Sequence, residues 1–253
     1  VLGDKGNLGA AWSYDTQTGY GGSTVLSTLT VVRADGDRFY VRSGAHTETW
    51  ERRADGVVMM TNFDDRWLGD PLFAPVFDEL NRRKAVVYTH PTLASCCGNF
   101  GGQQNLVPSI QFSMIEFGTD TTRAIAKVMF SGAQKRFPDI RFIWSHGGGT
   151  MPFLAERFMR AHQFSKQDLK AAVPDGVPAA LNRFYYDTAQ AAHPYAMSSF
   201  RQIIGLSQLV FGTDFPYRTA EETVKGLAGC EFTADELAAI DRGNALGLFP
   251  KFR

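Results

Sequence analysis

Two histidines and one aspartate in this chain each follow a short apolar run, and these residue types could bind a metal ion or move protons. His90 ends the run VVYTH, His146 ends RFIWSH before three glycines, and Asp214 follows LVFGT. Continuous apolar runs of this length are typical of buried parallel strands. Imidazole nitrogen and carboxylate oxygen suit a borderline divalent ion such as Zn²⁺, and also Mn²⁺. Because catalytic groups of a β/α barrel gather at the carboxyl ends of its strands, we expect one metal-centred site.

Each of these residues has a simpler interpretation when it is taken alone. His90 precedes a proline and could be a hydrogen-bonded loop residue, and Asp214 could cap the segment that follows it. The glycines after His146 match neither a P-loop nor the GxGxxG pattern. His193 is expected at the start of a helix rather than in the site. The coincidence of three strand ends favours the metal site over these separate interpretations.

From Val57 onward the chain alternates predicted strands with predicted helices, as parallel βα units do. Strands are predicted at 57–61, 85–89, 140–145, 184–187 and 209–212, and helices at 70–84, 120–136, 151–164, 194–204 and from residue 234. Asp70 and Pro71 suit the N-cap and the first position of the first helix. The apolar face of that helix is expected to contain Leu72, Phe73, Val76, Phe77 and Leu80. Thr233 and Glu236 form a capping box that opens the last helix.

Residues 1–56 have a different character, with nine glycines, no proline and no helical period. Two β-rich runs lie on either side of Asp35 and Gly36, which predicts an antiparallel hairpin. We therefore expect two parts in the chain: an atypical β-rich segment at 1–56 and a barrel-like domain at 57–253.

The composition is that of an ordinary globular protein, with 253 residues, 44% hydrophobic, 21% charged and a formal net charge of zero. It gives no sign of nucleic-acid binding and contains no apolar run of the roughly 18 residues that a membrane span needs. Cys96, Cys97 and Cys230 form no disulfide framework. Free thiols and the lack of a visible signal peptide favour a cytoplasmic location.

Four stretches of the chain together form a specific pattern. They are VVMMTNFDDRWLGDPLFAPVFDELNRRKAVVYTHPT, DTTRAIAKVMFSGAQKRFPDIRFIWSHGGGTMPFLAERF, RFYYDTAQAA and QLVFGTDFPYR. On these stretches, residues 57–250 resemble the aminocarboxymuconate-semialdehyde decarboxylase-like branch of the amidohydrolase superfamily, which is amidohydrolase family 2. The CCG after THPT resembles members similar to 6-methylsalicylate decarboxylase.

The resemblance implies a (β/α)₈ TIM-barrel fold with one divalent metal, Zn²⁺ first and Mn²⁺ as the alternative. It matches His90 to the metal ligand after strand five, His146 to the active-site histidine after strand six, and Asp214 to the metal-binding and catalytic aspartate after strand eight. It further implies a small-molecule carboxylic acid substrate and a homodimer. The His-x-His or Glu-x-His motif of strand one is absent before Val57. We therefore expect an incomplete barrel, with family-like strands four to eight.

Three functions remain open from the sequence. The first is metal-dependent decarboxylation of a small aromatic or unsaturated carboxylic acid, such as a hydroxybenzoate. The second is metal-dependent hydrolysis of a lactone or amide, which the same three residues would serve. The third is a non-catalytic fragment or pseudoenzyme that lacks the first metal ligands. A frameshifted or fragmentary reading frame would explain the missing motif, and a remodelled barrel is the alternative explanation.

Overall fold

The structure is a computed structural model that describes residues 11–16, 25–35, 38–43, 46–51, 56–94, 110–165 and 168–252. The chain divides into two compact units, Val1–Ala54 and Asp55–Arg253, and each is described here by itself. Cys96, Cys97 and the glycine-rich loop predicted at 97–104 lie outside the described residues.

The first unit holds an antiparallel sheet in the order β1-β2-β3-β4. Its strands are β1 (Ala11–Thr16), β2 (Val25–Asp35), β3 (Arg38–Ser43) and β4 (His46–Glu51). The β2–β3 pairing runs from Leu29 opposite Ser43 to Asp35 opposite Arg38, so the strands of the predicted hairpin are confirmed. Gly36 lies outside the described residues. Because every strand pairing described up to Glu51 is antiparallel, these strands form no parallel βα unit.

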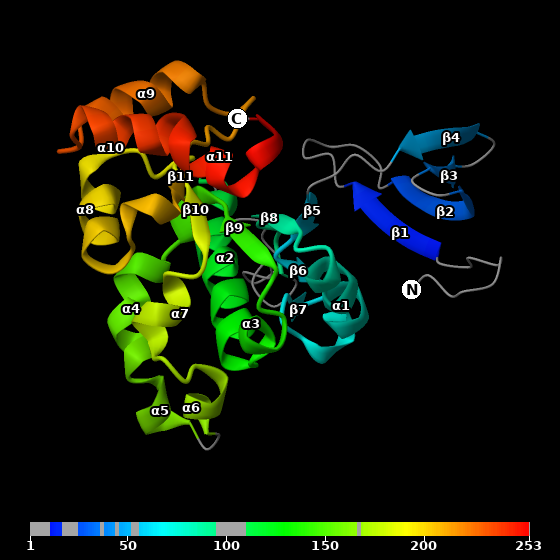
Figure 1. Cartoon of the computed structure of the whole chain (residues 1–253), viewed down its shortest axis with the longest axis horizontal. Coiled ribbons are helices and arrows are strands. Elements are labelled where there is room, and N and C mark those ends of the chain that lie inside the picture. The colour runs from blue at the N-terminus through cyan, green and yellow to red at the C-terminus, as the bar shows by residue number, and fades with distance from the viewer. Residues whose placement is uncertain are drawn as a thin grey trace. The chain divides into compact units, whose positions relative to one another are not determined.

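The second unit is built on a parallel sheet in the order β11-β10-β9-β8-β5 (Figure 1). Its strands are β5 (Gly56–Met60), β8 (Val86–His90), β9 (Arg141–Trp144), β10 (Tyr185–Asp187) and β11 (Leu209–Val210). A separate short hairpin pairs β6 (Asn62–Phe63) with β7 (Arg66–Trp67). Each strand of the large sheet pairs with the next one along the chain, as the strands of a β/α barrel do. The predicted α/β fold and the partial barrel are confirmed.

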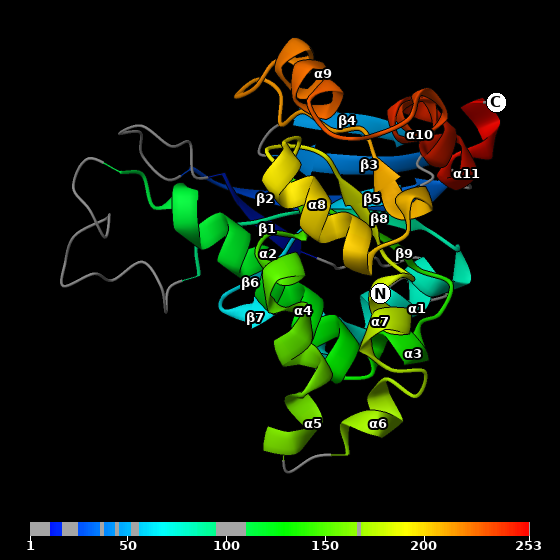
Figure 2. The same cartoon turned by 90° about the vertical axis from the view of Figure 1, so that its left-hand side faces the viewer.

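Helices follow the strands of this sheet. They are α1 (Ala74–Arg82), α2 (Ser113–Phe130), α3 (Ala133–Arg136), α4 (Met151–Met159), α5 (Ala161–Phe164), α6 (Leu169–Ala172), α7 (Val177–Leu181), α8 (Pro194–Ile203), α9 (Ala220–Ala228), α10 (Ala234–Ala238) and α11 (Asn244–Leu248). Figures 1 and 2 show α9, α10 and α11 at one end of the unit and α5 and α6 at the opposite end. At the first of these ends, α11 packs against β11.

The two faces of the parallel sheet have different neighbours. On one face Val87, Phe142, Trp144, Tyr186 and Leu209 join the main core, together with buried side chains of the helices. The opposite face holds a smaller cluster of Val86, Ile143, Val210 and Leu248, with Tyr88 and Tyr185 packed against it. Side chains alternate between the faces of a strand, so His90 shares the second face with Tyr88. In a barrel this second face is the interior.

Several predicted helix boundaries are wrong, each for a local physical reason. The predicted helix at 120–136 begins earlier, at Ser113, and breaks before α3 where Gly132 takes a left-handed φ of 76°. The predicted helix at 151–164 is divided at Arg160 into α4 and α5. Leu72 is 64% exposed rather than on the buried face of the first helix. Residues Pro71–Phe73 form a 3₁₀ turn, and its tighter winding turns Leu72 away from that face.

Candidate active site

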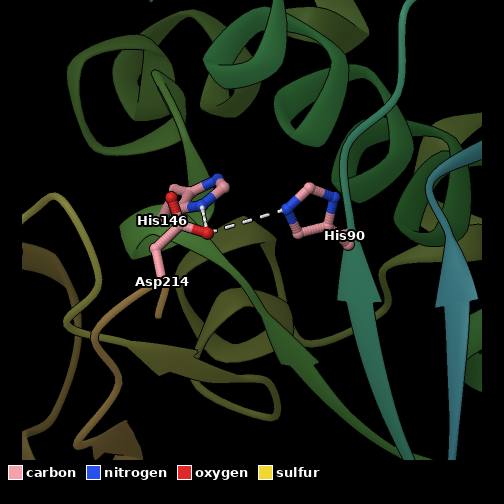
Figure 3. Close-up of side chains that lie close together, drawn as sticks. All are labelled: His90, His146 and Asp214. Atoms are coloured by element: carbon pink, nitrogen blue, oxygen red, sulfur yellow. Dashed lines mark ion pairs between the residues drawn. The ribbon is translucent and has the colours of Figure 1, made fainter. Parts of the chain in front are cut away.

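Three side chains predicted from the strand ends lie together at the carboxyl edge of the parallel sheet. His90 is the last residue of β8, and His146 and Asp214 lie in the segments that follow β9 and β11 (Figure 3). One potential ligand atom of each residue lies within 4.8 Å of the others. The Nε2 atoms of His146 and His90 are 3.4 Å and 3.9 Å from Oδ1 of Asp214. The structure therefore brings together all three predicted site residues.

The backbone after β9 turns sharply, and glycine is needed there. His146 and Gly147 have φ values of 53° and 60°, and Gly148 and Gly149 continue the positive φ. A Cβ atom on Gly149 would lie 2.0 Å from the carbonyl oxygen of Gly118, which no side chain can tolerate. The glycines therefore let the turn pack against α2 and neighbouring side chains, and they serve as a structural turn rather than a phosphate loop.

The tautomer of His90 suits metal binding. Its Nδ1 lies 2.8 Å from the carbonyl oxygen of Pro91, which can only accept a hydrogen bond. Nδ1 therefore carries the proton, and the lone pair of Nε2 is free to face Asp214. An imidazole held in this way by a backbone carbonyl is the usual arrangement of a metal ligand.

His146 is the more deeply buried of the two histidines. Its side chain is 10% exposed, against 33% for His90. Burial lowers the pKa of His146, the nearby His90 lowers it further, and Asp214 opposes both effects. Its Nε2 is buried and has no hydrogen-bond partner among the described residues. A neutral ring with an unpaired nitrogen aimed at a carboxylate can accept a proton or a metal ion.

Asp214 is held by its own segment and by a neighbour. It has a left-handed backbone with a φ of 65°, and its side chain is 12% exposed. The Nε2 of Gln190 donates a hydrogen bond of 2.5 Å to Oδ2, which leaves Oδ1 facing the two histidines. The three donors fit a divalent ion: two unpaired imidazole nitrogens and one carboxylate oxygen. All three side chains therefore lie within reach of one ion.

Sequence reasoning did not single out two buried aspartates next to the site. Asp187, the last residue of β10, accepts a 2.7 Å hydrogen bond from the hydroxyl of Tyr88. Burial raises the pKa of Asp187 to about 7, although Tyr88 and backbone N–H groups of Ala189, His146 and Gly147 favour its charged form. The sequence held a signal for Asp187, because this residue follows a short apolar run as the three site residues do.

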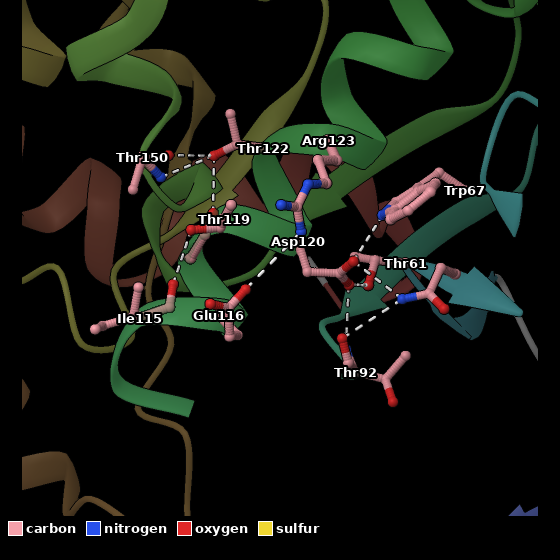
Figure 4. Close-up of polar contacts among 12 residues, drawn as sticks. Thr61, Trp67, Thr92, Ile115, Glu116, Thr119, Asp120, Thr122, Arg123 and Thr150 are labelled. Carbon is pink, nitrogen blue, oxygen red and sulfur yellow. Dashed lines mark hydrogen bonds and ion pairs between the residues drawn. The ribbon is translucent and has the colours of Figure 1, made fainter. Parts of the chain in front are cut away.

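Asp120, on α2, is the second buried aspartate (Figure 4). It accepts hydrogen bonds from the side chains of Thr61, Asn62 and Trp67 and from the backbone N–H of Thr92. The N–H of Thr61 in turn donates to the carbonyl oxygen of His90 at 3.0 Å. Asp120 therefore ties α2 to the β6–β7 hairpin and to the end of β8. No sequence pattern connects these distant residues.

His193 and the predicted caps have structural roles. His193 is the N-cap of α8, and its Nδ1 accepts a hydrogen bond from the N–H of Ala196. The capping box predicted at Thr233 and Glu236 is confirmed. His46 begins β4. None of the described helices is long and apolar enough to cross a membrane.

Comparisons with known proteins find similar sequences over most of the chain. The amidohydrolase family model Amidohydro_2 matches residues 46–251. The chain is 34% identical over 209 residues to Decarboxylase yanB of Aspergillus niger. This match covers 79% of this chain and 56% of that protein. It is 29% identical to 6-methylsalicylic acid decarboxylase of Penicillium expansum, with 79% and 61% covered. The chain thus spans less than two thirds of the length of these relatives.

Solved structures show the same fold. The structure of 5-carboxyvanillate decarboxylase LigW from Sphingomonas paucimobilis matches with a TM-score of 0.64 at 20% identity, covering 79% of this chain and 59% of that one. A dihydroxybenzoic acid decarboxylase from Polaromonas, solved with bound manganese and 2-nitroresorcinol, matches with a TM-score of 0.60 at 20% identity, covering 73% and 55%. These likenesses support the partial barrel seen in the second unit.

Proposed function

The chain belongs to the amidohydrolase family Amidohydro_2, and from this premise we propose that it is a metal-dependent decarboxylase of a small aromatic carboxylic acid. The observation that carries the proposal is the convergence of His90, His146 and Asp214 at the carboxyl ends of parallel strands. The relatives named as decarboxylases favour this reaction over hydrolysis of a lactone or amide, for which the same three residues would also be suitable.

We propose that His90 and Asp214 hold a divalent ion, Zn²⁺ first and Mn²⁺ as the alternative. Two nitrogens and a carboxylate oxygen suit both ions. A structural neighbour named as a decarboxylase was solved with bound manganese, which supports Mn²⁺ as the alternative ion. When bound, the ion would act as a Lewis acid that orients the substrate carboxylate and a neighbouring hydroxyl.

The side chains of the site would have different roles in the reaction. Decarboxylation breaks the bond between the ring carbon and the carboxylate, releases CO₂, and delivers one proton to that ring carbon. His146, buried and neutral, would act as base or proton shuttle at Nε2. Asp214 would hold the ion through Oδ1, receive a proton that His146 takes from water, and deliver that proton to the ring carbon. Gln190, bonded to Oδ2 of Asp214, would keep that carboxylate oriented.

The test is an assay of the purified chain supplied with Zn²⁺ or Mn²⁺. A panel of hydroxybenzoates is incubated with the protein, and CO₂ release and the decarboxylated phenol are measured together. We expect at least one ortho-hydroxybenzoate to be consumed with equal amounts of both products. Metal-loaded protein that converts no member of the panel but hydrolyses a lactone would support the alternative reaction. Metal-loaded protein inactive in both assays would support a non-catalytic role.

We further propose that the chain forms a homodimer and acts in the cytoplasm. The dimer rests on the family resemblance, and sedimentation equilibrium of the purified chain tests it. The location rests on three cysteines, Cys96, Cys97 and Cys230, whose spacing forms no disulfide framework. Fractionation of source cells with an antibody against the chain tests the location.

A further inference from the structure

Asp187 is a buried acid that the proposed mechanism does not use. It is 2% exposed and ends β10, between the strands that lead to His146 and to Asp214. It accepts hydrogen bonds from the hydroxyl of Tyr88 at 2.7 Å and from the N–H of Ala189 at 3.1 Å. These two donors, one on β8 and one in the turn after β10, fix the direction of this carboxylate.

The turn after β9 presents an anion-binding arrangement to Asp187. His146 and Gly147 are consecutive residues with left-handed φ values, and successive N–H groups in such a turn point to one side. Both of these N–H groups favour the charged form of Asp187 and lower its pKa against the effect of burial. A left-handed backbone is unfavourable for histidine, so something must hold it. Because β10 packs against residues 146–148, the carboxylate at its end is placed to stabilise this conformation.

The segment that carries Asp214 is also packed directly on Asp187. A Cβ atom on Gly212 would lie 2.8 Å from Cβ of Asp187 and 3.0 Å from its Oδ2, so only glycine fits there. The next residue, Thr188, donates from Oγ1 to the carbonyl oxygen of Gly212 at 3.2 Å and accepts from its N–H at 3.1 Å. Asp187 therefore contacts the backbone that leads to Asp214, and its strand packs against the turn that carries His146.

We propose that Asp187 is a positioning residue that holds the left-handed turn at His146 and the glycine before Asp214, and so sets the distance between these two side chains. The expected effect of Asp187 on kcat rests on the proposed decarboxylase function. Tyr88 orients the carboxylate through its hydroxyl. Asp187 lies behind the turn and touches no substrate in this scheme.

The experiment combines backbone NMR with kinetics on the full chain carrying Asp187→Asn. The matched control is Tyr186→Phe, one residue earlier on β10, which removes a 2.9 Å hydrogen bond to the carbonyl oxygen of Leu181 on the other face of the sheet. In Asp187→Asn we expect the amide signals of His146 and Gly147 to move upfield and kcat to fall about 10- to 100-fold at unchanged KM, as for other residues that orient active-site groups. Tyr186→Phe should move neither signal and keep kcat.

The outcomes separate the possibilities. Amide signals that stay in place in Asp187→Asn overturn the proposal, and so do moved signals with an unchanged kcat. If Asp187→Asn does not fold, Tyr88→Phe is measured instead, because it removes one donor to the carboxylate. In Tyr88→Phe, moved amide signals with a lower kcat support the proposal, and an unchanged kcat overturns it. A wild-type chain that decarboxylates nothing contradicts the proposed function, while the amide signals still decide whether Asp187 holds the turn.

Discussion

At the scale of single residues, His90 and His146 face the same carboxylate from different surroundings. His90 is one third exposed and has its Nδ1 bonded to a backbone carbonyl, which leaves Nε2 as a ligand. His146 is nearly buried, and burial lowers its pKa. The two rings lie at 76° to each other with centroids 5.3 Å apart. These surroundings favour ligation for His90 and proton transfer for His146.

This division of roles predicts different results for two alanine variants. In His146→Ala we expect turnover to fall at least about 100-fold, since a positioned acid–base group contributes that much, while metal content stays near that of the wild type. In Asp214→Ala we expect the metal to be lost as well. Turnover and elemental analysis are measured on the same preparations. The control is His162→Ala, an exposed residue of α5 that should change neither quantity. Equal metal loss in both site variants would make His146 chiefly a ligand.

The pKa of Asp187 predicts a pH dependence of stability. Burial raises that pKa to about 7 from an ordinary 3.8, so between these values the folded state binds more protons than the unfolded state. The stabilising contribution is therefore fully present below about pH 4 and is lost as pH rises through about 7. For metal-free protein, urea unfolding at pH 5 and pH 8 should show a larger loss of stability in the wild type than in Asp187→Asn.

The exposed Asp139 provides the control for this measurement. Asp139→Asn should lose as much stability between the two pH values as the wild type does, because its side chain is in water in both states. If wild type and Asp187→Asn lose the same free energy of unfolding, Asp187 does not titrate in this range.

At the scale of elements, Asp120 joins α2 to the β6–β7 hairpin and the end of β8. Asp120→Ala would leave up to four buried or partly buried donors without their acceptor, and each such loss is costly. We expect the free energy of unfolding to fall by roughly 3 kcal/mol or more. Urea denaturation measures this, with Asp139→Ala as a surface control expected within about 0.5 kcal/mol of the wild type. A loss below about 1 kcal/mol in Asp120→Ala would show that other contacts hold these elements together.

Elements whose signals are local could be predicted from the sequence. Asp70 caps the turn that opens α1, and Thr233 with Glu236 opens α10, because each cap involves residues at most three apart. The three site residues were also predictable, since the carboxyl ends of parallel strands meet at one edge. The helix break at Gly132 was missed because glycine is also tolerated inside helices.

Contacts between distant residues could not be predicted in the same way. Tyr88 and Asp187 are 99 residues apart, and only the arrangement of β8, β9 and β10 brings them together. Asp120 was assigned to the start of a helix, whereas it is the eighth residue of α2 and bonds to the β6–β7 hairpin. Both residues support the site from behind, and such roles leave no pattern in neighbouring positions.

At the scale of the whole molecule, we propose that residues 1–56 and 57–253 are separate domains. The parallel sheet, both apolar clusters and all three site residues belong to the unit that begins at Asp55. A chain that begins at Asp55 should therefore fold and retain the metal binding of the full chain. Near-UV circular dichroism and elemental analysis test this. Loss of near-UV signal in the shortened chain would show that the first unit is needed for folding.

The ligand set also predicts how tightly the protein holds its metal. Among the described residues, the groups that could bind the ion are His90, His146 and Asp214, and we assign only His90 and Asp214 as ligands. Water must then fill several positions, and affinity falls with each missing protein ligand. We expect dialysis against a mild chelator to remove the ion, and activity to return and saturate as free Zn²⁺ or Mn²⁺ is added. His90→Ala should need a much higher metal concentration for the same activity. Stoichiometric metal that survives the dialysis would mean that further ligands complete the site.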